Sequence, residues 1–191
     1  MFRDYCSATK IKSFGPSKKY NFQHNNKNYT AIGGCIGAPL AVITLENAIE
    51  SGGKHFFTFG SAGWLSIQKP QSNIIDTISY VHDQTGISED YGSESKILQS
   101  GEKTGFQIVS TNSFYQLTES KVKKHRDQNI ALIDMEFAPL LFITSLFKLS
   151  LNSLFVISDF VDQAYNWKNL TNTTEFSETL NSGFQHLNEM L

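Results

Sequence analysis

The stretch Ile130-Ala-Leu-Ile-Asp-Met-Glu136, continued to Phe155-Val-Ile-Ser-Asp159, decides the fold. The apolar runs Ile130–Ile133 and Leu154–Ile157 have the length of buried strands, and segment 137–149 between them is long enough for a helix. The pattern predicts strand, helix, strand, with an acid after each strand. Parallel α/β sheets bind ligands beyond the carboxyl ends of their strands. We therefore expect Glu136 and Asp159 to face one ligand; the alternative is that Asp159 only caps the next element.

Length, charge and cysteine content narrow the class of protein. A chain of 191 residues fits one domain with a full core. The net charge of −2 gives no electrostatic case for binding nucleic acid. No apolar run reaches the length of a membrane span, and residues 1–30 are too polar for a secretion signal. Cys6 and Cys35 lack metal-ligand spacing and suit a reduced, cytoplasmic protein.

The first part of the chain predicts an arm, a hairpin and a helix. Residues 1–19 are polar without a clear period, so we expect an N-terminal arm or loop, followed by one domain over residues 20–191. The polar turn 24–28 joins two short strands. Pro39 suits the first turn of a helix that stops by Gly52-Gly53.

Two loops of small residues follow predicted strands. Gly33-Gly-Cys-Ile-Gly37 leads into the helix at Pro39, where bare backbone N–H groups and the helix dipole favour an anion. A tight structural turn is the alternative. The strand His55–Phe59 ends in Gly60-Ser-Ala-Gly63-Trp64-Leu65, which predicts a second such loop facing the same crevice.

The remaining pattern alternates strands and helices, as in α/β proteins. We expect strands at 73–81 and 104–110, helices at 117–126 and 174–191, and loops at 84–101 and 160–172. Phe114 and Tyr115 follow a strand end, where aromatic rings either stack on a ligand or cover the core.

Five motifs in series resemble the nucleoside phosphorylase and nucleosidase superfamily. They are Gly-Cys-Ile-Gly-Ala-Pro, Phe-Gly-Ser-Ala-Gly, Ser-Thr-Asn-Ser-Phe-Tyr, Asp-Met-Glu and Ile-Ser-Asp, in family order from about Tyr20 onward. The family includes uridine phosphorylases, hexameric purine nucleoside phosphorylases and methylthioadenosine nucleosidases. The resemblance implies a three-layer α/β domain with a central mixed sheet flanked by helices.

The resemblance also implies roles for individual residues. Met135 and Glu136 match the Met-Glu beneath the ribose, and the glutamate of that pair accepts hydrogen bonds from the sugar. Asp159, after Ser158, matches the aspartate that protonates a departing purine. The remaining matches are Phe114 beside the base, Ser61 and Gly63 near the nucleophile, and Gly37 in the first glycine loop. No metal or organic cofactor is implied, and phosphate is a possible co-substrate.

The chain departs from the family on the nucleophile side. Thr58 stands where phosphorylases carry a phosphate-binding arginine, and threonine supplies neither its charge nor its bidentate geometry. Too few residues precede Gly33 for the family's early strand, with its phosphate contact or its water-activating glutamate. Lys10, Lys12, Lys18 and Lys19 either supply positive charge or are solvated lysines of the arm.

We therefore expect an enzyme that cleaves the N-glycosidic bond of a nucleoside by phosphorolysis or hydrolysis, and Asp159 favours a purine nucleoside. The alternatives are a nucleoside-binding or regulatory homologue without turnover, and a subunit completed by a longer paralogous partner. The family's assemblies imply a homo-oligomer.

Overall fold

The computed structural model describes residues 9–14, 17–91, 97–100 and 105–191. Within these residues, eight strands form one mixed sheet in the order β11-β10-β4-β9-β8-β6-β7, and β5 pairs with β10 beside this path. Their bounds are β4 His55–Trp64, β5 Ile74–Ile75, β6 Ile78–Gln84, β7 Ile97–Gln99, β8 Phe106–Thr111, β9 Ile130–Asp134, β10 Ser150–Val161 and β11 Trp167–Asn169. The helices are α2 Ala38–Glu50, α3 Ile87–Asp90, α4 Glu119–Asp127, α5 Phe137–Leu146 and α6 Thr174–Met190, with a 3-10 turn, η1, at Phe114–Gln116.

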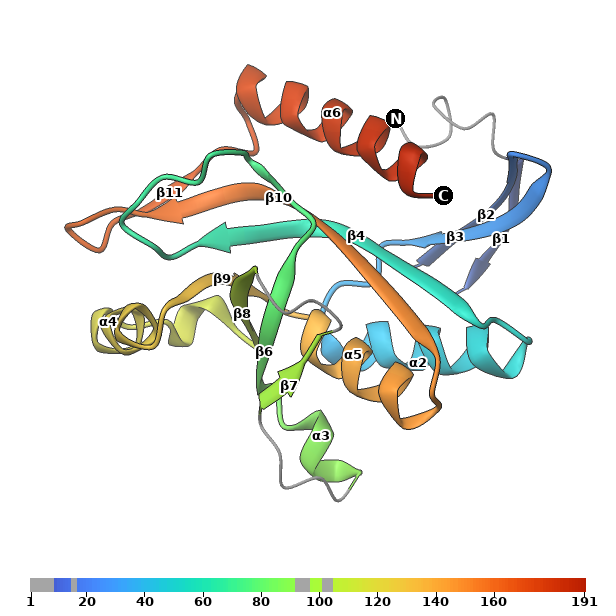
Figure 1. Cartoon of the computed structure of the whole chain (residues 1–191), viewed down its shortest axis with the longest axis horizontal. Coiled ribbons are helices and arrows are strands. Elements are labelled where there is room, and N and C mark those ends of the chain that lie inside the picture. Colours follow the sequence, from blue (N-terminus) through green and yellow to red (C-terminus); the bar gives the residue numbers. More distant parts are fainter. Residues whose placement is uncertain (1–8, 15–16, 92–96, 101–104) are drawn as a thin grey trace.

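Helices cover both faces of the sheet, so the predicted α/β domain with a central mixed sheet is confirmed. Figure 1 shows α6 on one side and α2 with α5 on the other. Successive side chains of β10 pack against helices on opposite faces of the sheet, because side chains alternate along a strand. Phe155 packs edge-on against Phe137 of α5, whereas Val156 lies under Gly183 of α6, where an added methyl group would come within 2.9 Å. No helix in the described ranges has both the length and the apolar character needed to cross a bilayer.

A smaller antiparallel sheet stands beside the main one and contains β1 Thr9–Phe14, β2 Ser17–His24 and β3 Lys27–Gly33. Its β2–β3 turn is the predicted polar turn, with Asn25 and Asn26 in the left-handed region at φ 47° and 61°. The Tyr29 hydroxyl donates to the Leu191 carbonyl oxygen at 2.6 Å, which ties this sheet to the end of α6. The predicted loop is wrong for residues 9–14 and 17–19, which pair as strands; residues 1–8 and 15–16 lie outside the described ranges.

The predicted parallel arrangement of the two acid-bearing strands is wrong. β4 lies between β9 and β10, parallel to β10 and antiparallel to β9, so the two strands run in opposite directions. The sequence between β9 and β10 carries no sign of this insertion, because the inserted strand comes from far earlier in the chain. Gly63 of β4 nevertheless pairs with Ile133 on one side and Asp159 on the other. The end of β10 therefore lies level with β9.

Four local predictions also change. The predicted loop 60–65 is mostly strand, because β4 continues to Trp64 with a partner on each side. Segment 73–81 is divided between β5 and β6, and the predicted loop 160–172 contains β11. Segment 84–101 holds α3 and β7, with residues 92–96 and 101 outside the described ranges.

Candidate functional site

A cavity of about 250 Å³ lies where β4, β10 and β11 meet the turn η1. Its lining consists of Ser61, Ala62, Gly63, Phe114, Ser158, Asp159, Trp167 and Asn169. Five of these residues were predicted from the sequence: Ser61, Gly63, Phe114, Ser158 and Asp159. The cavity thus brings together three motifs that are spread over about a hundred residues of chain, from Ser61 to Asp159.

A β-bulge turns Asp159 toward the cavity. Along the β10–β4 pair, Ile157 is opposite Ala62 and Asp159 is opposite Gly63, so Ser158 is an extra residue without its own partner. Bulges re-aim side chains and are frequent beside active sites. The carboxylate of Asp159 comes so close to the bare Cα of Gly63 that a methyl group there would lie 2.9 Å from Oδ2. Glycine is what leaves room for the carboxyl group.

The Asp159 carboxyl group is suited to hold a proton. Burial raises its pKa, and the hydrogen bond that the Ser158 hydroxyl donates to Oδ1 opposes this shift without cancelling it. A carboxylic acid with a raised pKa remains protonated to higher pH and can donate that proton to a leaving group.

Two aromatic rings form one wall of the cavity. The ring centroids of Phe114 and Trp167 are 5.8 Å apart with an interplanar angle of 47°. Each side chain is 40% exposed, so both offer ring surface to a ligand. A methyl group on Gly63 would also lie 3.2 Å from Cη2 of Trp167, which places that ring beside the Asp159 carboxyl group. This combination suits a flat ligand that accepts a proton at its edge.

The other predicted carboxylate, Glu136, lies at the start of α5 and outside the cavity lining. Its Oε1 accepts a hydrogen bond from the backbone N–H of Gly37 at 2.5 Å. Gly37 has φ 89°, a conformation that glycine adopts without strain, and it directly precedes α2. Burial raises the pKa of Glu136, while the N–H groups of Gly37 and Met135 oppose the rise. The amide predicted to face an external anion is therefore already paired with a carboxylate of the chain.

The predicted site residues thus form two groups. Ser61, Gly63, Phe114, Ser158 and Asp159 line the cavity, whereas Gly37, Met135 and Glu136 meet at the first turns of α2 and α5. Within the described ranges, His, Cys, Asp and Glu side chains do not form a group of three that could bind a metal ion.

The sequence interpretation missed Ala62, Trp167 and Asn169 of the cavity lining. Trp167 and Asn169 belong to β11, where Asn169 pairs with Asp159 across the sheet. A tryptophan in an otherwise polar segment was the signal that could have identified this part of the site.

Comparison with solved structures identifies the fold. A purine nucleoside phosphorylase from Toxoplasma gondii in complex with immucillin-H aligns with a TM-score of 0.79 and 14% identity, over 98% of this chain and 86% of that chain. A uridine phosphorylase from Vibrio fischeri ES114 aligns at 0.68 and 17% identity, covering 93% and 78%. Its complex with 6-hydroxy-1-naphthoic acid aligns at 0.71 and 17%, covering 95% and 79%. No protein family model and no curated protein matches the sequence. The chain has the nucleoside phosphorylase fold.

Proposed function

We propose that this protein cleaves the N-glycosidic bond of a nucleoside, with the base in the cavity beside Phe114 and Trp167. Asp159 donates a proton to the departing base. The observation that carries the proposal is a partly buried carboxyl group of raised pKa at the edge of an aromatic wall. A base is a poor leaving group as an anion, so protonation during bond cleavage lowers the barrier. A proton donor at this place favours a purine over a pyrimidine base.

Glu136 is assigned to the sugar. Breaking the bond between base and ribose builds positive charge on the sugar, which a nearby carboxylate stabilises. A carboxylate has two oxygens with several lone pairs. Oε1 of Glu136 accepts a hydrogen bond from the Gly37 N–H, and we assign Oε2 to accept hydrogen bonds from the sugar hydroxyls.

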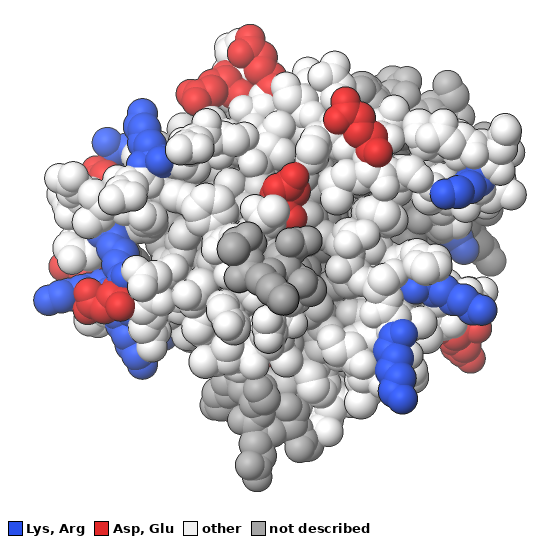
Figure 2. Space-filling view, in the orientation of Figure 1, with Lys and Arg blue, Asp and Glu red and all other residues white. Residues whose placement is uncertain are grey.

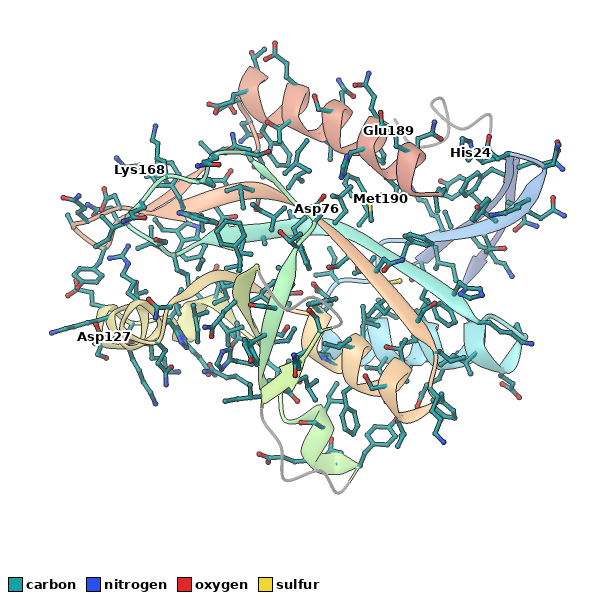
Figure 3. The ribbon with its side chains drawn as sticks, in the orientation of Figure 1. His24, Asp76, Asp127, Lys168, Glu189 and Met190 are labelled. Atoms are coloured by element: carbon teal, nitrogen blue, oxygen red, sulfur yellow. The ribbon has the colours of Figure 1, made fainter. Side chains whose placement is uncertain are left out.

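The nucleophile is either phosphate or water. Lys, Arg and His are absent from the cavity lining, all of whose residues are described. Lys168, labelled in Figure 3 beside β11, pairs with Asp162 at 3.4 Å. In Figure 2 the basic side chains lie toward the two sides of the molecule with some acidic ones among them, and further acidic side chains lie over α6 and near the centre of this face. The lack of a cation at the cavity supports a second candidate function, nucleoside binding without turnover.

The test is release of base from purine and pyrimidine nucleosides, with and without phosphate. Asp159→Asn and Glu136→Gln should each abolish turnover. Asp76→Asn is the control, because Asp76, labelled in Figure 3, is exposed, pairs with His186 of α6 and does not line the cavity. Binding without base release selects the second function, and unchanged turnover in both site variants contradicts the proposed site.

A further inference from the structure

We infer that Asp134 is a positioning residue, whose buried side chain holds the start of α5 so that Glu136 is free to reach the start of α2. Its effect on catalysis rests on the function proposed above. Asp134 is the last residue of β9 and is only 3% exposed. Its Oδ2 accepts hydrogen bonds from the N–H groups of Glu136 at 3.1 Å and Phe137 at 2.7 Å.

Ser110 completes this arrangement from the neighbouring strand β8. Ser110 is fully buried and pairs with Asp134 across the parallel strands. Its hydroxyl donates to Oδ1 of Asp134 at 2.5 Å and accepts from the N–H of Ala138 at 2.8 Å. Together the two side chains satisfy three consecutive N–H groups, at 136, 137 and 138, that an isolated helix start would leave unpaired.

This capping explains the orientation of Glu136. Glu136 stands at the N-cap position of α5, but its side chain makes no capping hydrogen bond there. Residues at this position often turn their side chains back to the first amides of the helix. Asp134 and Ser110 already occupy those amides, so the Glu136 carboxylate extends to Gly37 instead. Asp134 thereby sets the place of the Glu136 side chain through the hydrogen bond to the Glu136 backbone N–H.

The charge of Glu136 influences the protonation of Asp134. Burial raises the pKa of Asp134 to about 7, the hydrogen bond from Ser110 opposes the rise, and the charge of Glu136 adds to it. With a pKa of about 7, Asp134 holds a proton in only part of the molecules at neutral pH, and that proton removes the charge repulsion between Asp134 and Glu136.

The chain offers a matched control in Asp83. Asp83 is the next-to-last residue of a neighbouring parallel strand, β6, is 4% exposed and pairs across the sheet with Ser110. Its carboxylate accepts from the N–H groups of Thr85 at 2.7 Å and Ser88 at 3.1 Å. Burial acts to raise its pKa, but the bonds from Ser88 and Thr85 outweigh burial and lower it. Asp83→Ala removes a similar buried carboxylate whose hydrogen bonds go to Thr85 and Ser88 and not to the α5 amides.

The test measures the NMR chemical shift of the Gly37 amide proton, which reports whether the Glu136 carboxylate is in place. This proton should lie downfield in the native protein and move upfield in Glu136→Gln. Asp134→Ala should reproduce that upfield shift, and Asp83→Ala should not. Asp134→Asn, whose oxygen can still accept from the two α5 amides, should retain the native shift. If Asp134→Ala does not fold, Ser110→Ala replaces it and should move the same proton in the same direction.

Kinetics provides the second reading. Asp134→Ala should lower turnover on the order of 10- to 100-fold, as expected for a displaced catalytic group. Asp83→Ala should not cause this loss, because the Asp83 carboxylate bonds to Thr85 and Ser88 and not to the α5 amides. An unmoved Gly37 proton in Asp134→Ala, or an equal loss of turnover in Asp83→Ala, would overturn the inference. If the native protein releases no base, the proposed function fails, while the NMR comparison still decides the role of Asp134.

Discussion

Gly63→Ala tests whether the cavity depends on a missing side chain. Gly63 lies in β4 between Ile133 of β9 and Asp159 of β10. The added methyl group would stand 2.9 Å from Oδ2 of Asp159, 3.0 Å from Cγ2 of Ile133 and 3.2 Å from Cη2 of Trp167. Three neighbours on different strands would have to move at once.

The distances set the size of the effect. Ordinary contacts of a Cβ atom begin at 3.4 Å, so Asp159 Oδ2 would have to retreat by roughly 0.5 Å from a contact that most proteins avoid. Because a misplacement of 1 Å costs on the order of 100-fold in rate, a retreat of half that distance predicts about a tenfold loss of turnover. Overpacking should also lower the free energy of unfolding by about 1–3 kcal/mol.

Base release and urea unfolding measure the two effects. Gly60→Ala is the matched control, since Gly60 lies three residues earlier in β4 and a methyl group there would meet nothing within 4 Å. The control should keep its turnover and unfold within about 1 kcal/mol of the native protein. Full turnover and native stability in Gly63→Ala would refute the packing argument.

Three further predictions concern pH dependence and binding. Burial in the folded protein raises the pKa of Asp134 from its usual 3.8 to about 7, so between these pH values the folded protein binds a proton that the unfolded chain releases. The contribution of this proton to the free energy of unfolding therefore falls by roughly 2–3 kcal/mol between pH 5 and pH 8. Asp134→Asn should remove this fall when urea unfolding is measured at the two pH values. An equal fall in Asp134→Asn and the native protein would contradict the prediction. Burial, helped by electrostatic repulsion from neighbouring basic side chains such as Lys124, lowers the pKa of His125, and neither ring nitrogen has a partner among the described residues. Stability should thus drop as pH falls below 6.5, and His125→Leu should abolish that drop in thermal unfolding, whereas a persisting drop would assign it to other groups. Trp167→Ala should weaken nucleoside binding by about 1–3 kcal/mol in calorimetry, through lost stacking; native affinity would place the base elsewhere.

Local patterns predicted the elements whose structure is set by neighbours in sequence. The turn at Asn25 and Asn26 was predicted because asparagine tolerates the left-handed backbone. The closing helix was predicted from its apolar stripe, of which Phe184 and Leu187 are buried. The direction of β9 relative to β10 was not predictable in this way, because it depends on β4, which the chain makes long before either strand.

In the candidate site, too, residues in local motifs were predicted, whereas features that depend on pairing with distant strands were not. The family motifs pointed to Asp159, Phe114 and Gly63, and the structure brings these three together. The bulge at Ser158 is defined only by the register against β4, so the sequence gives no sign of it. Trp167 was missed because β11 has three residues and is a strand only through its pairing with β10.

The place of β4 between two later strands has a consequence for folding during synthesis. His55 of β4 bonds to Ser150 of β10, 95 positions further along the chain. At about 5–20 residues per second, a ribosome needs roughly 5–20 s to make that interval. Throughout this time the run Phe56-Phe57-Thr58-Phe59 has no partner on its β10 edge, and such edges readily recruit other chains. The site therefore closes late in translation, and until then this strand edge of the nascent chain is open to pairing with other chains.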